Sequence, residues 1–386
     1  MIRVDEVRDA AELAAHEAEW NGLLERSPAA ELFQTPEWLT SWLASFWAGR
    51  PLAFLFVRTG GRLTALAPFL RDGDGSLRCP GSLALPTDEM SWRGALVHEG
   101  PAADAVGAVL DSLNGRPFRL VLGRMAGDAP TNQALRDALD ARHLWGVWRE
   151  DLATPYIRLP RSVDAYLGSR SRHVRHEYRR KAKRLEAVGA VTVDVATGPD
   201  ELAAALDAVA LIERCSWKDR AGTSFLSRPG AGRFYRTLFE RAAARGWGRI
   251  YVMRLNGVPI AYVLGMVYRN RYHAFNCSFD AGFGGYSPGA VLMLRVIEDA
   301  IGRGYEELDF LGSEYRWKRE LCTDVRPHVS ACVFSRIASR CGVCWAMDQH
   351  LKPYARAHLP ALVWVKQHVV AWRRNRRREP APAGSA

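Results

Sequence analysis

The order of predicted elements between residues 249 and 318 constrains the fold of this 386-residue chain more than any other feature. Two β-rich segments, 249–255 and 258–267, flank Asn256-Gly257, the pair that most readily forms a type I′ hairpin turn. A third strand is predicted over 271–280, followed by a polar turn, a helix and a further strand at 307–312. This order predicts an α/β protein in which a helix begins beside the gap between two strands.

The helix is predicted over 290–304 because its apolar residues recur with the spacing of one helix face. Ser287 is the expected N-cap, Pro288 suits the first helical position, and Gly304 is the expected C-cap. Free backbone N–H groups and the positive end of the helix favour a phosphate or carboxylate there. The alternative is that Ser287-Pro288-Gly289 only starts a helix.

A second hairpin is predicted over residues 51–70, turning at Gly60-Gly61 and preceded, like the first, by a helical segment. We therefore expect two related α/β halves, each a mixed, mostly antiparallel sheet flanked by helices. The prolines at 155 and 160 mark the break between them. The expected domains are 1–153, 154–340 with the active site, and 341–386 as a C-terminal helix and basic flexible tail.

The composition is that of a globular protein, with 48% hydrophobic and 25% charged residues. The first twenty residues are polar and acidic where a signal peptide is apolar, and no run approaches the roughly 20 apolar residues of a spanning helix. The seven irregularly spaced cysteines predict no disulfide framework, and the lone Cys341-x-x-Cys344 pair predicts no metal site. A cytoplasmic location is expected.

The net charge of +11 is concentrated in two segments. Residues 170–184 contain eight Lys or Arg against one Glu, and residues 373–379 contain five Arg against one Glu, which together account for the whole excess. The first segment predicts a helix that clamps a polyanion such as a coenzyme, a tRNA end or a lipid-linked diphosphate, or one with a solvated basic face. Its apolar stripe consists of Val174, Tyr178, Ala182, Leu185 and Val188.

The C-terminal segment 359–378 is apolar at first and then sharply basic. This pattern is typical of an amphipathic helix. We expect it either to dock on the partner domain or to lie on an anionic membrane, which would make the protein peripheral to the inner face of the membrane.

Several segments together resemble the CelD-type acetyltransferases of cellulose and exopolysaccharide production, which are similar to the FemAB-like branch of the GNAT acyltransferases. The resemblance covers about residues 15–335. It implies tandem GNAT-like domains and transfer of an acyl group to an amine or hydroxyl. The segments that carry it are PEWLTSW (36–42), SRHVRHEYRRKAKRLEA (171–187), SWKDRAGT (216–223), NGVPIAY (256–262), FD (279–280), YSPGAVL (286–292) and LDFLGSEYRWK (308–318).

The resemblance also implies that the donor's phosphates lie near residues 287–289. The chain departs from ordinary GNAT enzymes at this turn, because their Arg/Gln-x-x-Gly-x-Gly/Ala signature is replaced by the sequence of residues 283–289, FGGYSPG. The leading expectation is an acyl-CoA-dependent N- or O-acyltransferase, with no bound cofactor, that acts on a small-molecule, glycan or lipid-linked precursor of the cell envelope or a polysaccharide. The alternatives are a FemAB-like transferase that uses aminoacyl-tRNA, and a non-catalytic basic binding module.

Acyl transfer requires a base, a stabilised oxyanion and a protonated leaving group. Asp280, where the third strand meets the turn, is the first candidate for the base, and its alternative role is to start the turn. Glu314 is the second candidate, and Tyr286 either protonates the leaving group or packs against the turn. The residues expected to bind the donor are Ser287, Pro288, Gly289, Arg175 and Arg179, and those expected on the acceptor side are Trp217, Lys218, Arg220, Arg316 and Lys318.

Overall fold

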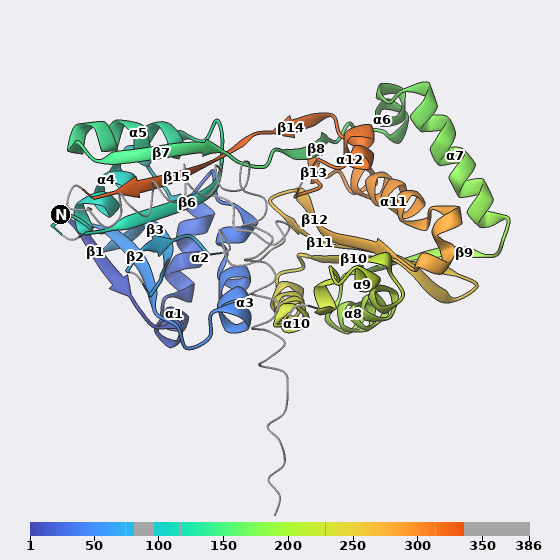
Figure 1. The fold of residues 1–386 in the computed structure, drawn as a ribbon, viewed down its shortest axis with the longest axis horizontal. Helices are drawn as coiled ribbons and strands as arrows, with labels where there is room; N and C mark the ends of the chain where they lie inside the picture. The colour runs from blue at the N-terminus through green and yellow to red at the C-terminus, as the bar shows by residue number, and fades with distance from the viewer. Residues whose placement is uncertain (74, 81–95, 116, 228, 313, 336–386) are drawn as a thin grey trace, which may run out of the picture.

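The structure is a computed structural model in which two β-sheets lie beside each other, each covered by helices (Figure 1). The predicted C-terminal helix and tail, and Cys341-x-x-Cys344, lie outside the described residues. Those residues are 1–73, 75–80, 96–115, 117–227, 229–312 and 314–335.

The first sheet has eight strands, in the order β1-β2-β3-β4-β6-β15-β7 with β5 paired to β3. Its one parallel pair among the described strands is β4 with β6. The strands are β1 (Ile2–Val7), β2 (Leu52–Thr59), β3 (Arg62–Arg71), β4 (Leu77–Arg78), β5 (Val97–His98), β6 (Arg119–Ala126), β7 (Trp145–Glu150) and β15 (His328–Phe334).

The second sheet has seven strands, in the order β9-β10-β11-β12-β13-β8-β14. Its one parallel pair among the described strands is β12 with β13, at the same position as in the first sheet. The expected α/β fold of two mixed, mostly antiparallel sheets is thus confirmed. The strands are β8 (Thr154–Arg158), β9 (Val191–Ala196), β10 (Gly248–Leu255), β11 (Val258–Tyr268), β12 (Arg271–Phe279), β13 (Glu307–Asp309) and β14 (Asp324–Arg326).

The chain passes from the first sheet to the second after β7 and returns to the first sheet with β15. β8 follows β7 along the chain but pairs with β13 and β14, whereas β15 follows β14 but pairs with β6 and β7. The change of sheet between Glu150 and Thr154 lies where the sequence predicts the break. β15, however, belongs to the first sheet although it lies within the expected domain 154–340, because the chain returns to fill the place beside β6.

The predicted local elements of the second half are present. Asn256 and Gly257 both have positive φ angles, 49° and 83°, as a type I′ turn requires. The helix α11 ends at Gly302, and Gly304, with φ of 73°, follows its C-cap Arg303. The helices are α1 (Ala10–Ala15), α2 (Glu17–Arg26), α3 (Pro36–Phe46), α4 (Ala102–Ser112), α5 (Pro130–Arg142), α6 (Val163–Ser169), α7 (Arg172–Glu186), α8 (Pro199–Arg214), α9 (Trp217–Arg220), α10 (Ala231–Ala243), α11 (Pro288–Gly302) and α12 (Arg316–Leu321), with 3-10 helices η1 (Leu32–Gln34), η3 (Phe225–Ser227) and η4 (Ala281–Tyr286).

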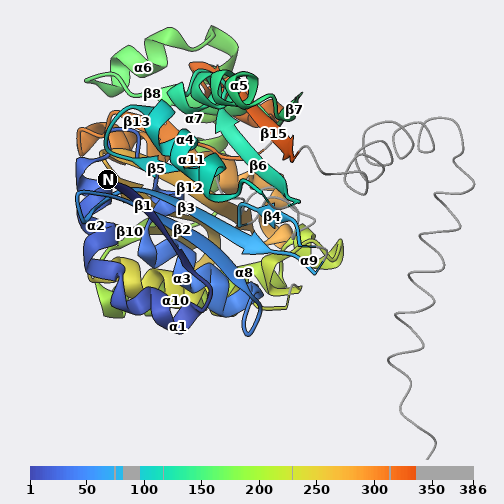
Figure 2. The same ribbon diagram turned by 90° about the vertical axis from the view of Figure 1, so that its left-hand side faces the viewer.

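The halves share a core, because the helices that precede the two hairpins, α3 and α10, pack against each other (Figures 1 and 2). Trp38 of α3 is 1% exposed, and its ring centroid lies 5.2 Å from that of Phe234 on α10 and 5.1 Å from that of Phe275 on β12. One apolar cluster therefore runs from the first sheet to the α8 and α10 face of the second. A separate cluster lies between the second sheet and α7 and α11.

Polar contacts also join the halves. The Arg269 guanidinium, in the turn between β11 and β12, donates to the carbonyls of Leu24, Ser27 and Pro28 at the end of α2. The carbonyls of Leu24 and Ser27 also accept from the N–H groups of Ser27 and Ala30, so Arg269 adds a second donor at the C-terminal end of α2, where a cation suits the helix dipole. Arg245 adds an ion pair, at 2.7 Å, to Glu37, which is 3% exposed.

Among the described residues, no helix combines the length and apolar character needed to cross a bilayer.

Candidate active site

The strands β12 and β13 pair over only three residues and then part. The pairs are Arg271 with Glu307, Tyr272 with Leu308 and His273 with Asp309, after which β13 ends while β12 continues to Phe279. The pairing of β12 with β11 also shifts register next to Gly265, as at a β-bulge. From Ala274 onward, the edge of β12 that faces the gap has backbone groups that β13 does not satisfy. An extended ligand can pair with such an edge.

Two lysines bind the carbonyls of the diverging segments. Lys218 of α9 donates to Asn276 Oδ1 at 2.6 Å and to the Cys277 carbonyl at 2.8 Å, both on β12. Lys318 of α12, 5% exposed, donates to the carbonyls of Phe310 and Leu311, which follow β13, at 3.1 and 2.7 Å. One ammonium group therefore stands on each side of the gap. No local sequence pattern predicts the short helices that carry these lysines.

The start of α11 offers fewer backbone donors than the sequence predicts. Ser287 occupies the N-cap position, but it adopts a left-handed conformation with φ of 55°, and its side chain makes no capping bond. Its carbonyl accepts from the N–H groups of Ala290 and Val291, and Pro288 has no N–H. Gly289 supplies the remaining N–H of the first turn. A Cβ at Gly289 would lie 3.1 Å from the Phe279 ring, so the turn packs tightly on β12.

Asp280 starts the 3-10 helix η4 that leads into α11. Its Oδ1 accepts from the Gly282 N–H at 2.8 Å, and its backbone forms an isolated bridge with Ser216, just before α9. The turn-forming role is therefore present, and the bridge brings Asp280 beside the helix that carries Lys218. Tyr286, at the end of η4, is half-buried against the cluster between the second sheet and α7 and α11.

The remaining predicted residues are more scattered. Glu314 pairs with Arg319 at 2.6 Å, and Arg316, with its side chain 90% exposed, pairs with Glu320 at 3.1 Å. These four side chains lie close to Lys318 in sequence, but they form ion pairs with each other. The exposed residues Trp217 and Arg220 flank Lys218 on α9, while Arg175 bonds to the carbonyls of Leu167 and Gly168 and Arg179 is exposed on α7.

A buried carboxylate behind the gap was missed from the sequence. Glu213, at the end of α8, is 0% exposed and accepts from Tyr262 Oη at 2.6 Å and Ser224 Oγ at 2.5 Å. Burial and the adjacent Glu213 raise the pKa of Tyr262 well above its ordinary value. The cluster anchors the segment 213–216, which in turn bridges to Asp280. A glutamate inside an apolar helix stripe is the signal that could have identified it.

A polar cavity of about 490 Å³ lies between the halves at the paired end of β12. Arginines, acids and histidines from both halves line it, including Glu31, His98, Arg271, His273 and Arg326. Arg326 binds Glu307 at 2.8 Å and the buried Asp309 at 3.1 Å. His273 is three residues from Asn276, a separation of about 10 Å along a strand. The cavity therefore opens next to the point where β12 and β13 part.

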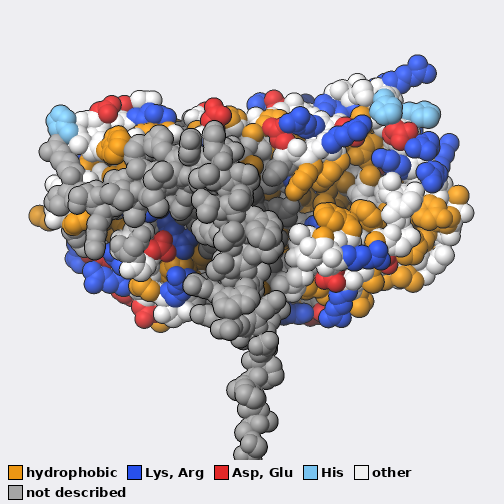
Figure 3. Space-filling view, in the orientation of Figure 1, with side chains coloured by type: hydrophobic (Ala, Val, Ile, Leu, Met, Phe, Trp, Pro, Cys, Tyr) orange, Lys and Arg blue, Asp and Glu red, His pale blue; other side chains and the backbone are white. Residues whose placement is uncertain are grey.

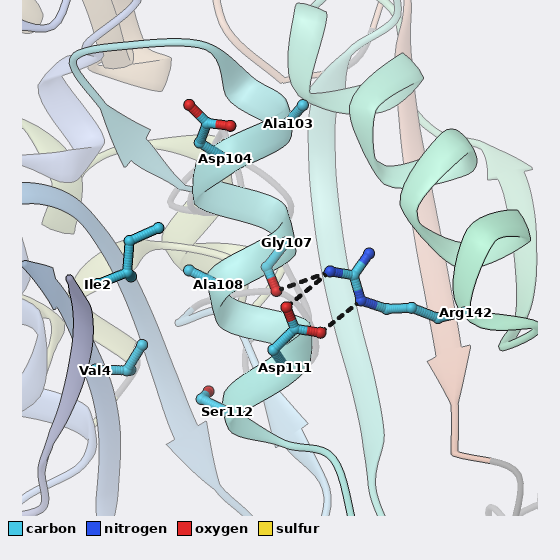
Figure 4. Close-up of a pocket in the computed structure, with 9 residues that line it drawn as sticks. All are labelled: Ile2, Val4, Ala103, Asp104, Gly107, Ala108, Asp111, Ser112 and Arg142. Carbon is cyan, nitrogen blue, oxygen red and sulfur yellow. Dashed lines mark hydrogen bonds and ion pairs between the residues drawn. The ribbon is translucent and has the colours of Figure 1, made fainter. Parts of the chain in front are cut away.

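A second hollow, on the outer surface of the first half, contains no comparable chemistry. It is open and lined by α4, β1 and the end of α5, where Arg142 and Asp111 bind each other at 2.7 Å (Figure 4). The hydrogen bond from Arg142 lowers the pKa of Asp111. This pair joins two helices and lies far along the chain from the gap.

One family model and several solved structures match this chain. Residues 172–319, which contain the gap and both lysines, match the family model of the acetyltransferase (GNAT) domain. FemX aligns with a TM-score of 0.57 and 13% identity over 82% of this chain and 95% of its own. No curated protein matches the chain.

Two further solved structures are similar. The C-terminal domain of a putative lysylphosphatidylglycerol synthetase from Agrobacterium fabrum aligns with a TM-score of 0.52 and 12% identity, over 88% of this chain and 97% of its own. L-PGS from Bacillus licheniformis aligns with a TM-score of 0.52 and 11% identity, over 86% and 95%. At such identities the similarity establishes the fold alone. The chain is thus an α/β protein of two mixed sheets, and residues 172–319, most of its second half, are similar to the GNAT acetyltransferase domain.

Proposed function

We propose that this protein is an acyltransferase that moves an acyl group from an acyl-CoA to an amine or hydroxyl of a cell-envelope or polysaccharide precursor. The observation that carries the proposal is the gap between β12 and β13, with Lys218 and Lys318 on its two sides and the start of α11 at its end. The match of residues 172–319 to the GNAT domain supports the reaction class. The resemblance to CelD-type enzymes supports the acceptor class.

The gap supplies groups that acyl transfer needs. An amine or hydroxyl attacks the thioester carbon, the carbonyl oxygen becomes an oxyanion, and the thiolate leaves after the nucleophile loses its proton. The N–H groups on the edge of β12 beyond its pairing with β13, and the nearby ammonium groups, are suited to stabilise the oxyanion. Asp280 is proposed as the base, and Tyr286 as the proton donor to the leaving group. The Gly289 N–H and the positive end of α11 are proposed to face the donor's phosphates.

The cavity between the halves is the proposed acceptor site. It carries both charge signs and several imidazoles, so it suits a polar acceptor with charged groups rather than an apolar one. Its position next to the parting of β12 and β13 would bring an acceptor nucleophile to the apex of the gap. The donor would enter from the other end of β12, where α11 begins.

A different donor, aminoacyl-tRNA, is supported by one observation. The basic helix α7 packs against both α11 and η4, so the positive end of α11 is next to further positive charge. A large polyanion such as tRNA would contact both the positive end of α11 and the basic helix α7, whereas the phosphates of a coenzyme need only the end of α11. The third hypothesis is that the protein is a non-catalytic basic binding module. This hypothesis predicts no turnover with either donor.

Thermal shift measurements with acetyl-CoA, longer acyl-CoAs and charged tRNA distinguish these donors. A ligand at a hundred times its Kd adds about 2.7 kcal/mol to the stability of the folded state, which raises Tm by a few degrees. We expect such a rise with at least one acyl-CoA and none with uncharged tRNA. If no acyl-CoA shifts Tm while charged tRNA is retained, the acyl-CoA proposal fails and the aminoacyl-tRNA alternative takes its place.

A further inference from the structure

The helix α7 runs along the edge of the molecule and presents a basic face to solvent (Figures 1 and 3). Its opposite face is buried against α11 through Tyr178 and Leu185, which are 5% and 0% exposed. A helix repeats every 3.6 residues, so the residues directed away from this buried stripe form one band. The charged and imidazole side chains of that band, all exposed, are Arg172, His173, His176, Arg179, Arg180, Lys183 and Arg184.

Most of this charge is not neutralised within the fold. The two carboxylates of α7 flank the band: Glu177 pairs with Arg180 at 2.9 Å, and Glu186 lies 3.8 Å from Arg295 of α11. Within the part of the chain that the structure describes, no carboxylate lies within ion-pair distance of the remaining four cations. These four are Arg172, Arg179, Lys183 and Arg184. The packing of α7 therefore does not require them.

The shape of this band favours a flat anionic partner. Residues 172–184 rise about 18 Å along one straight helix, so their charges lie along a line rather than around a groove. Two exposed valines stand at its end: Val188 is 41% exposed and Val258 is 55% exposed. The Ala190 N–H donates to Asn256 Oδ1 at 2.8 Å, which holds the tip of the hairpin that carries Val258 to the segment that follows α7.

We propose that α7, with the two valines at its end, docks on an anionic lipid surface. Clustered Lys and Arg near such a surface gain affinity from its negative potential, and small apolar side chains can enter the headgroup region. The band has no Phe, Tyr or Trp, the large rings on which bases of a single-stranded nucleic acid stack best. The proposal rests on acyl-CoA as the donor, because an aminoacyl-tRNA would itself occupy α7, and it does not involve the C-terminal basic segment.

Sedimentation of the full chain with vesicles tests this proposal. The vesicles are phosphatidylcholine alone, or phosphatidylcholine with about one third phosphatidylglycerol. We expect the wild type to sediment with the anionic vesicles only. The variant Arg172→Gln/Lys183→Gln/Arg184→Gln should bind them about a hundredfold more weakly, because three cations are removed. Glutamine is a good helix former, and circular dichroism checks that α7 remains intact.

The matched control is Arg149→Gln/Arg214→Gln/Arg233→Gln, which removes three exposed arginines elsewhere and gives the same net charge. It should retain most of the binding. Equal losses in the two variants would mean that net charge alone attracts the protein, and unchanged binding of the α7 variant would mean that another segment does so. Both results overturn the proposal. A duplex RNA that binds through α7, with no sedimentation on anionic vesicles, would also overturn it.

Discussion

At the scale of single residues, Asp280 offers the sharpest test of the proposed chemistry. Asparagine has an oxygen where Asp280 Oδ1 accepts from Gly282, so Asp280→Asn should keep the turn. It lacks a basic carboxylate, and turnover should fall about a hundredfold or more with Tm unchanged. Turnover with acyl-CoA and thermal unfolding are the two measurements. The exposed Asp219→Asn is the control, and full activity of Asp280→Asn would remove Asp280 as the base.

The thiols differ in a way that chemical labelling can measure. Cys79 is 0% exposed, and burial raises the pKa of its thiol to about 12, whereas Cys215 is exposed. Since only the thiolate reacts, iodoacetamide near neutral pH should modify Cys215 and leave Cys79 intact until the protein unfolds. Peptide mass mapping before and after denaturation gives the result. Modification of both at the same rate in the native protein would contradict the burial of Cys79, which directly follows β4.

At the scale of elements, the ion pair between α2 and β2 should make stability depend on pH. The Arg58 guanidinium donates to both Glu19 oxygens, at 2.5 and 2.6 Å, and these bonds lower the pKa of Glu19. A carboxyl group whose pKa is lowered on folding stabilises the folded state at pH values above its ordinary pKa, about 4.3. This contribution is lost as the pH falls below that value.

The variant Glu19→Gln should therefore be less stable than the wild type by about 1 kcal/mol near neutral pH, and the difference should shrink as the pH drops below about 4.3. Urea unfolding across this pH range measures it. Glu12→Gln, at an exposed position of α1, is expected to show no such dependence. A difference that grows on acidification would contradict the assignment.

The elements differ in how far the sequence predicts them. The hairpins, α11 and the apolar stripe of α7 follow from spacing and turn residues, and the structure has all of them, except that Val188 is 41% exposed. The Ser287 hydroxyl does not cap α11, because the residue turns left-handed to join η4 to the helix. A serine before a proline indicates a helix start, but the φ angle depends on how the preceding turn packs on Phe279.

At the scale of the whole molecule, the return of β15 to the first sheet makes the first half depend on residues near 330. Val333 of β15 is 0% exposed, although it is more than 180 residues from most of the sheet that it completes. Val333→Asp would bury an unpaired carboxylate between β6 and β7 and should destabilise the protein by about 4 kcal/mol or more.

Urea unfolding followed by tryptophan fluorescence measures this effect. Trp38 and Trp42 of the first half, both 1% exposed, contribute to the signal because their fluorescence changes when unfolding exposes them. Val325→Asp makes the same change at a 41% exposed position of β14 and should cost about 0.5 kcal/mol or less. If the two variants were equally stable, β15 would not be an essential strand of the first sheet.

The sequence by itself determined the local elements, the two related halves and the place where a helix starts beside a strand gap. These features depend on residue spacing and turn chemistry within about twenty positions, and such patterns can be recognised in a single sequence. Only the tertiary structure decided the return of β15 to the first sheet, the burial of Glu213, and the positions of Lys218 and Lys318 on the diverging strands. Each depends on contacts between segments tens to hundreds of residues apart, where many pairings satisfy the same local pattern and packing selects one.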